Sequence, residues 1–346
     1  MTPRRDQPAG ADIRDVRSRH IPVLLSHVLE MLHPGDGQRF IDGTFGAGGY
    51  TRAILAAANC EVLALDRDPS AIAGGAALVE QFSPRLKLIE SEFGVLDEVA
   101  EREGFAPVDG VVLDIGVSSM QLDEADRGFS FQADGPLDMR MSGRGMSAAD
   151  VVNGYDESEI ADILYQLGEE HRSRAVARAI VRRRAQQPFA RTLDLADVVT
   201  RALGGRRGDQ KVHPATRTFQ ALRIFVNDEL GELERALQAG ERVLKPGGRL
   251  VVVTFHSLED RIVKRFLTTR SGQAPRGSRF LPDTSNQFVE PSFQIVNRRP
   301  LTSEKGELNV NPRARSARAR AAVRTAAPHW PNERDGSGRG GGTQQR

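Results

Sequence analysis

The first third of the chain alternates short apolar runs with helical patterns, and this alternation restricts the fold more than any other feature. Such an order is typical of parallel βαβ units. It predicts an α/β protein built on a doubly wound sheet with helices on both faces. We expect strands at 39–42, 61–66, 86–90 and 108–114, and helices at 49–58, 69–82 and about 95–103.

The sheet pattern returns late in the chain. We expect an amphipathic helix at 229–244, a stop at Lys245-Pro-Gly-Gly, and an apolar strand at 249–255. Residues 313–325 alternate arginine with alanine and valine. This segment fits either a basic edge strand or a solvated tail, and we favour the strand.

Between these parts, strand patterns are absent and helical ones take over, including 158–167 and 172–184. We interpret this region as an inserted helical domain, which fits a chain longer than one compact domain usually is. The expected organisation is a disordered N-terminal tail at 1–19, a discontinuous sheet domain at 20–123 and 224–325, the insertion at 124–223, and a disordered C-terminal tail at 326–346.

Charge is distributed unevenly. Residues 1–19 carry a net charge of +2 and residues 313–346 carry +6, so the segment 20–312 carries −6 in a chain whose total is +2. Binding to nucleic acid therefore requires a local basic patch. Residues 171–184 supply six arginines and no acid, with Arg174 and Arg178 on one helical face, although a solvated charged face is the competing interpretation.

The single cysteine, Cys60, excludes an intramolecular disulfide, and we predict no bound metal. The first 19 residues lack the apolar core of a signal peptide, and no window approaches 18 uninterrupted apolar residues. We therefore expect a cytoplasmic protein without a membrane partner. The sequence does not indicate an oligomeric state.

The sharpest local signal is Phe40-Ile-Asp-Gly-Thr-Phe-Gly-Ala-Gly-Gly-Tyr50, where a strand enters a glycine-rich turn before a helix. Glycines let the backbone approach a ligand closely, although a tight structural turn also needs them. Asp66 ends the next strand, where a carboxylate can accept hydrogen bonds from ribose hydroxyls. These features leave two cofactors, NAD and S-adenosylmethionine.

The glycine spacing favours S-adenosylmethionine. Gly43-x-x-Gly46-x-Gly48-Gly49 departs from the dinucleotide pattern G-x-G-x-x-G, and Asp42 is unfavourable beside a pyrophosphate. S-adenosylmethionine has no phosphate, and its sulfonium is a cation. Phe93 is placed either to flank the adenine or to fill the core, and Asp114 brings a carboxylate to the sheet edge where ligands bind.

Several longer stretches carry a family resemblance: Phe40-Ile-Asp-Gly-Thr-Phe-Gly-Ala-Gly-Gly, Leu65-Asp-Arg-Asp-Pro, Asp114-Ile-Gly-Val-Ser-Ser-Met-Gln-Leu-Asp123, Arg127-Gly-Phe-Ser-Phe, Asp134-Gly-Pro-Leu-Asp-Met-Arg-Met141, His213-Pro-Ala-Thr-Arg-Thr-Phe-Gln-Ala-Leu-Arg223, Phe255-His-Ser-Leu-Glu-Asp-Arg261 and Asn311-Pro-Arg-Ala-Arg-Ser. Together, over about 20–325, they resemble the bacterial 16S ribosomal RNA cytosine-N4 methyltransferases known as RsmH or MraW. The resemblance implies a Rossmann-like class I methyltransferase sheet with a helical substrate-recognition insertion. It also implies S-adenosyl-L-methionine as methyl donor and, as target, a cytidine in the decoding centre of 16S rRNA, within the small ribosomal subunit or its precursor.

The implied cofactor-binding residues are Gly48, Gly49, Tyr50, Asp66, Phe93, Asp114 and Gln121. Tyr50 departs from the family pattern, because many members have His at this position. Since the turn would contact the ligand mainly through its backbone, we expect binding to survive.

Methylation of cytosine N4 calls for a hydrogen-bond acceptor on the amine, because the ring delocalises the nitrogen lone pair. Asp114 is the first candidate for this catalytic role, with cofactor binding alone as the alternative. Ser118, Ser119 and the pair His256-Ser257 are further candidates. Carbon-5 methylation is disfavoured because it needs a thiolate and Cys60 enters a buried strand.

Two other functions remain open from the residues alone. An RNA-binding ribosome-assembly factor without catalysis would share the basic helical segment, and a nicotinamide oxidoreductase would share the sheet. DNA is not distinguished from RNA as a substrate. For either polymer, the target base must leave its stack to reach a pocket.

Overall fold

A seven-stranded sheet forms the centre of the computed structural model, which describes residues 22–205, 212–273 and 289–331. The strand order is β3-β2-β1-β4-β5-β7-β6. Strands β1 to β5 run parallel, whereas β7 pairs antiparallel with both β5 and β6. The strands are β1 (Arg39–Asp42), β2 (Glu61–Asp66), β3 (Leu86–Glu90), β4 (Val108–Asp114), β5 (Leu244–Thr254), β6 (Phe293–Ile295) and β7 (Arg318–Arg324).

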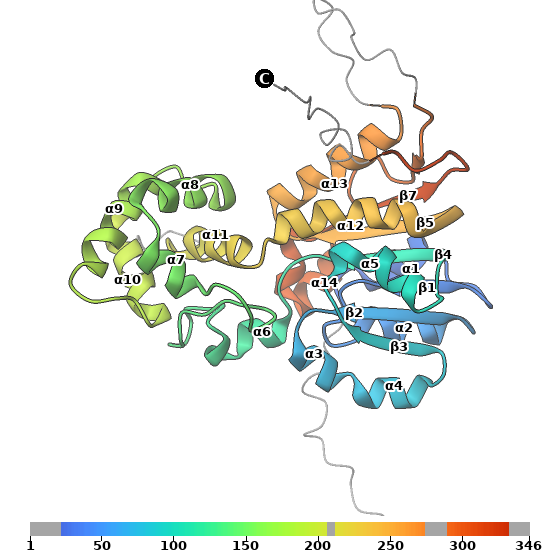
Figure 1. The fold of residues 1–346 in the computed structure, drawn as a ribbon, viewed down its shortest axis with the longest axis horizontal. Coiled ribbons are helices and arrows are strands. Elements are labelled where there is room, and N and C mark those ends of the chain that lie inside the picture. Colours follow the sequence, from blue (N-terminus) through green and yellow to red (C-terminus); the bar gives the residue numbers. More distant parts are fainter. Residues whose placement is uncertain (1–21, 206–211, 274–288, 332–346) are drawn as a thin grey trace, which may run out of the picture.

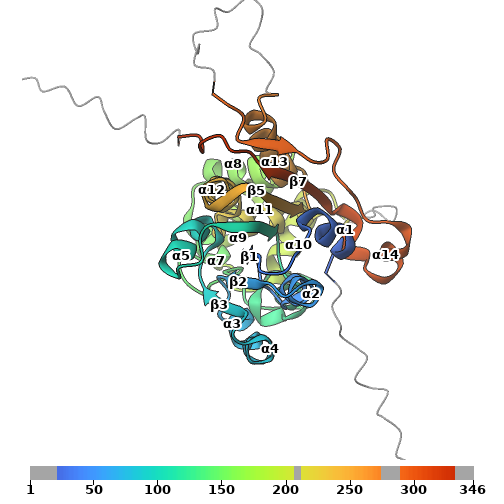
Figure 2. The same ribbon diagram turned by 90° about the vertical axis from the view of Figure 1, so that its right-hand side faces the viewer.

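Helices cover both faces of this sheet (Figure 2). Helices α1 to α4 contribute to one apolar cluster, and α5, α12 and α13 to another. Alternate strand residues feed the two clusters, so that Phe40 belongs to the first and Ile41 to the second. The helices are α1 (Leu25–Leu32), α2 (Gly49–Ala57), α3 (Pro69–Gly74), α4 (Ala76–Phe82), α5 (Leu96–Arg102), α12 (Glu229–Val243), α13 (Ser257–Arg270) and, near the chain end, α14 (Lys305–Val310).

A separate helical cluster lies beside the sheet body, on the side of α3 and α6 (Ser119–Asp123), which follow the carboxyl ends of β2 and β4 (Figure 1). It has its own apolar core, and the described part of 124–223 contains no strand, only a bridge between Pro136 and Arg191. A helical insertion in a doubly wound sheet is therefore confirmed, while the boundaries 124–223 stay a prediction. The helices are α7 (Ala148–Gly154), α8 (Glu157–Gly168), α9 (Ser173–Arg184), α10 (Thr192–Ala202) and α11 (Thr216–Val226).

The first four strands have the predicted bounds, but the expected helix at 69–82 and the expected helix stop at 245–248 were wrong in detail. The helix expected at 69–82 is divided at Gly75, where an added Cβ would lie 2.3 Å from Leu88 Cδ2. The segment expected as a helix stop, Lys245-Pro-Gly-Gly, already belongs to β5. Leu244 pairs with Val108 there, and a bulge separates this pairing from the regular register.

The basic segment near the C-terminus forms strand β7, as favoured, but the expectation of an edge strand was wrong. Strand β6 covers its outer side, with Gln294 opposite Val323. Two of the three arginines of β7 are buried: Arg320 Nε donates to Asp260 Oδ1 at 2.6 Å, and Arg324 Nε donates to the carbonyl of Glu241 at 3.0 Å.

The expected C-terminal disorder does not hold for residues 326–331, which the structure describes. Trp330 Nε1 donates to the carbonyl of Glu290 at 2.9 Å, and the Arg270 guanidinium lies 4.7 Å from the indole centroid. The tails expected at 1–19 and over the rest of 326–346 lie outside the described residues. In the described parts of the chain, no helix has the length and apolar character needed to cross a membrane.

Candidate active site

A cavity opens at the carboxyl ends of β1, β2 and β4, where the strand order reverses. Ligands of doubly wound sheets bind at this type of crevice. The structure brings together six of the seven predicted cofactor-binding residues along its wall: Gly49, Tyr50, Asp66, Phe93, Asp114 and Gln121.

Gly48 does not line the cavity, although sequence reasoning placed it there. It caps α2 with a φ of +74°, in the left-handed region, and an added Cβ would lie 2.8 Å from both Leu78 Cδ2 and Phe45 Cζ. Glycine is therefore required here by the turn and its packing.

Asp42 stabilises the glycine-rich turn through two hydrogen bonds. Its Oδ1 accepts from the backbone N–H of Thr44 at 3.1 Å, and its Oδ2 accepts from the Thr51 hydroxyl at 2.7 Å. The side chain is fully buried and does not line the cavity. Burial raises the pKa of Asp42 to about 6, and the nearby Asp66 carboxylate adds to this rise.

Asp66 presents its carboxylate to the cavity from the end of β2. Its Oδ2 accepts from the N–H of Gly46 at 2.7 Å, and its Oδ1 accepts from the N–H of Asp68 at 2.8 Å. Each carboxylate oxygen can accept a second hydrogen bond. A ribose hydroxyl could therefore bind without displacing either backbone partner.

Asp114 ends β4 and lines the cavity, and its backbone N–H donates to Thr44 Oγ1 at 2.7 Å. Within the described residues its buried Oδ1 has no hydrogen-bond partner. Burial, followed by the negative charges of Asp42 and Glu259, raises the pKa of the Asp114 carboxyl to about 8. A cation bound beside it would favour the ionised form.

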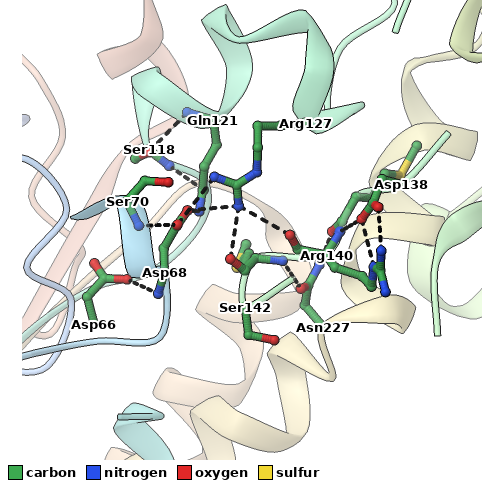
Figure 3. Close-up of polar contacts among 12 residues, drawn as sticks. Asp66, Asp68, Ser70, Ser118, Gln121, Arg127, Asp138, Arg140, Ser142 and Asn227 are labelled. Carbon is green, nitrogen blue, oxygen red and sulfur yellow. Dashed lines mark hydrogen bonds and ion pairs between the residues drawn. The ribbon is translucent and has the colours of Figure 1, made fainter. Parts of the chain in front are cut away.

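Gln121 lines the cavity, but its amide is engaged by protein groups (Figure 3). Its Nε2 donates to Asp68 Oδ2 at 2.8 Å, and its Oε1 accepts from the N–H of Ser118 at 3.1 Å. Arg127 also pairs with Asp68 at 2.9 Å and donates to the carbonyl of Met141 at 2.9 Å. Gln121 thus helps to fix the junction between the sheet loops and the segment that leads to the helical cluster.

Although burial acts in the opposite direction, hydrogen bonds from Arg127 and Gln121 hold the pKa of Asp68 below its ordinary value. Asn227 fixes the same junction from the other side, since its Oδ1 accepts from the N–H of Met141 at 2.8 Å and its Nδ2 donates to the carbonyl of Met139 at 2.7 Å (Figure 3). These contacts join distant parts of the chain around the cavity.

Tyr50 anchors one wall of the cavity, which gives its side chain a structural role here. Its hydroxyl donates to the carbonyl of Val23, and burial raises its pKa well above the ordinary value. The N–H of Leu24 in turn donates to Glu307 Oε1 at 2.7 Å. The N-terminal segment at 22–24 and helix α14 are thereby held together at the cavity.

Of the other predicted catalytic candidates, only Ser118 has a side chain that the structure places at the cavity. Its Oγ caps α6 by accepting from the N–H of Gln121 at 3.2 Å. The side chain of Ser119 lies outside the described part. His256 and Ser257 do not line the cavity: His256 caps α13, and the hydroxyl of Ser257 donates to Glu169 Oε2 at 2.9 Å.

Sequence reasoning missed three residues that shape the cavity: Thr44, Phe255 and Asn311. Thr44 lies in the glycine-rich turn, so its hydroxyl was a visible signal. Phe255 and Asn311 begin two of the stretches that carried the family resemblance. Nothing in their local sequence shows that they line the same cavity as Asp114.

S-adenosylmethionine fits this cavity. The unpartnered carboxylate of Asp114 suits a sulfonium cation, the Asp66 oxygens suit ribose hydroxyls, and the Phe93 side chain suits an adenine ring. Within 22–205, 212–273 and 289–331, no cluster of three His, Cys, Asp or Glu residues is placed to hold a metal ion.

The sheet topology and this cavity fit the class of S-adenosylmethionine-dependent methyltransferases. The profile of the MraW methylase family matches residues 17–325, and the chain belongs to that family. It is 59% identical over 314 residues to "Ribosomal RNA small subunit methyltransferase H" of Parvibaculum lavamentivorans, covering 91% of this chain and 92% of that protein. A protein of the same name from Azorhizobium caulinodans is 60% identical over 315 residues, covering 91% of this chain and 90% of that protein. The predicted family, fold class and methyl donor are confirmed.

Proposed function

We propose that this chain transfers a methyl group from S-adenosylmethionine to the N4 amine of a cytidine in the decoding centre of 16S rRNA. The substrate would be the small ribosomal subunit or its precursor in the cytoplasm. The names of the relatives support ribosomal RNA of the small subunit as the substrate class. The proposal of an amine as the methyl acceptor rests on the unpartnered carboxylate of Asp114 in the cavity.

Asp114 is the proposed acceptor for a hydrogen of the N4 amine. The bound donor supplies an electrophilic methyl carbon, so that the bond from N4 forms as the carbon–sulfur bond breaks and sulfur retains the electron pair. A carboxylate that accepts from N4 orients the nitrogen lone pair toward that carbon and then takes the released proton. Thr44 fixes the backbone of Asp114 for this task.

Two competing methylation chemistries lack the residues that they require. Carbon-5 methylation needs a thiolate. Cys60, however, lies just before β2, at the amino ends of the strands and not at the carboxyl ends where the cavity lies. Its Sγ is 3.5 Å from the carbonyl oxygen of Ile54, and burial raises the pKa of the thiol. Ribose methylation commonly uses a lysine base, and none of the described lysines lines the cavity.

Helix α9 offers phosphate contacts, although fewer than the sequence suggested. Arg172, Arg183 and Arg184 donate to carbonyl or carboxylate groups of the protein, and Arg178 pairs with Glu157. Among the described residues, the exposed side chains of Arg174 and Arg182 have no such partner. They lie eight residues apart, which is a rotation of about 80° around the axis of α9. We propose these two arginines as contacts to the RNA backbone.

The test uses small subunits from a strain that lacks this protein. Purified protein and S-adenosylmethionine with a labelled methyl group are added, and the rRNA nucleosides are analysed by mass spectrometry. The proposal predicts labelled N4-methylcytidine from one position of 16S rRNA, and no label with the Asp114→Asn variant. Label on another base or on ribose would refute the assignment of cytidine N4 as the methyl acceptor. Binding to subunits without any label would indicate an assembly factor.

A further inference from the structure

The polar side chains that line the cavity differ in whether they are already engaged. Hydrogen bonds or ion pairs within the protein engage Thr44, Tyr50, Asp66, Arg67, Asp68, Ser118 and Gln121. Two remain. Within the described residues, neither the carboxylate of Asp114 nor the amide of Asn311 has a hydrogen-bond partner.

The sheet order assigns the two ends of the cavity to different ligands. Asp66 ends β2, on one side of β1, whereas Asp114 ends β4, on the other side, and Phe255 comes directly after the neighbouring strand β5. A nucleoside held at Asp66 and Phe93 would therefore occupy the β2 end. The β5 end, with Phe255 and Asn311, would stay open for a second planar group.

Phe255 offers that group a stacking surface. Gly116 adjoins the ring, and a Cβ added there would lie 3.5 Å from Phe255 Cδ2. Gly116 and Phe255 both line the cavity, and Gly116 itself places no side chain against this edge of the ring. Unstacked bases bind commonly against aromatic side chains, while their polar edges pair with amide and carboxylate groups.

Asn311 is held firmly at this place. It follows α14, where its N–H donates to the carbonyl of Glu307 at 2.7 Å and its carbonyl accepts from the N–H of Ala314 at 3.0 Å. Glu307 is in turn bound by the N–H of Leu24. The free amide therefore sits on an anchored turn, as a group that recognises a ligand must.

We propose that Asn311 recognises the target cytosine, donating from Nδ2 to the ring nitrogen N3 while Asp114 accepts from N4. This inference rests on the function proposed above and adds a specificity-determining residue to it. The two side chains match adjacent groups on the cytosine edge, one acceptor and one donor. Uracil presents a donor at N3 and an acceptor at position 4, so it would oppose both contacts.

A cycle that combines a protein variant with a base analogue tests this contact. The substrate is a small subunit reconstituted with RNA that carries either cytidine or 3-deazacytidine, which lacks the N3 acceptor, at the target position. With cytidine, we expect Asn311→Ala to lower kcat/KM about 10- to 100-fold, as for loss of a buried hydrogen bond to a substrate. Wild-type protein should lose a similar factor with 3-deazacytidine, and the variant should then cause no further loss.

Controls separate recognition from folding. Glu304→Ala changes an exposed residue of the same segment that does not line the cavity, and its kcat/KM should equal that of the wild type. Asn311→Asp keeps the size of the side chain but removes its N–H donors, so it should behave like Asn311→Ala. The Kd for S-adenosylmethionine should stay within twofold for Glu304→Ala and Asn311→Ala, which add no charge to the cavity.

Three results would overturn the inference. Wild-type protein could methylate 3-deazacytidine as well as cytidine, Asn311→Ala could lose the same factor on both substrates, or Asn311→Ala could retain full activity. In each case wild-type methylation of the cytidine substrate shows that the proposed function itself holds. Failure of the wild type to methylate that substrate would instead refute the proposed function, and the inference with it.

Discussion

Raising the pH from 7 to 8 is expected to tighten the binding of S-adenosylmethionine about fivefold, because Asp114 must lose a proton when the cation binds. In the free protein, burial and the charges of Asp42 and Glu259 raise the pKa of Asp114 to about 8. About nine-tenths of the molecules therefore carry this proton at pH 7. A positive sulfonium beside the carboxylate favours its ionised form.

The size of the effect follows from the charge of the ligand. A unit charge about 5 Å away, at an effective dielectric constant of about 20, contributes about 3 kcal/mol, which equals roughly two pKa units. Binding would then lower the pKa of Asp114 from about 8 to roughly 6. The complex would release about 0.8 proton at pH 7, and the affinity would level off above about pH 9.

Isothermal titration calorimetry from pH 6 to 9, in two buffers of different ionisation enthalpy, measures both the affinity and the released protons. S-adenosylhomocysteine is the matched ligand control, since it keeps the titrating amino group and the adenosine but lacks the sulfonium charge. Its affinity should vary less with pH. The Asp114→Asn variant should remove the difference between the two ligands. Equal pH dependence of both ligands in the wild type would refute the argument.

Three further outcomes are expected from thermal or denaturant unfolding. Asp114→Asn should raise the free energy of unfolding at pH 7 by about 2 to 4 kcal/mol. The reason is that the wild type loses stability as the pH rises from about 4 toward the raised pKa of this buried acid. Unchanged stability would contradict the raised pKa. Gly48→Ala should lower the free energy of unfolding by about 2 to 4 kcal/mol. Gly37→Ala, at a φ of +73° but with open space around the added Cβ, should lower it by only about 1 kcal/mol. Equal losses would contradict the packing argument. Tyr50→Phe should cost about 1 to 2 kcal/mol by leaving the carbonyl of Val23 unpaired, and a neutral result would contradict its anchoring role.

Local patterns were sufficient to predict much of the sheet. Strands β1 to β4 have the predicted bounds because each is a short apolar run closed by polar or turn residues. The position of β7 was not predictable in the same way. Its arginines suggested an exposed edge, but Arg320 and Arg324 are buried and donate to Asp260 and to the carbonyl of Glu241. Such pairing depends on which distant segments fold together, and no spacing along the chain reveals it.

The same limit applies to the candidate site. Asp66, Phe93 and Asp114 could be predicted to lie together because they stand at or shortly after strand ends, and strand ends of a parallel sheet share one edge. The family resemblance implied a cofactor-binding role for Gly48, yet this glycine packs against Phe45 and Leu78 in the core. Asn311 was not identified because it reaches the cavity from a segment almost 200 residues after Asp114.

The most direct measurement is a crystal structure of the protein with S-adenosylhomocysteine. Our account predicts the ribose at Asp66, the adenine beside Phe93, the sulfur next to Asp114, and open space between Asp114 and Asn311 for a base. A nucleoside bound outside this cavity, or one that fills the β5 end and engages Asn311, would contradict it.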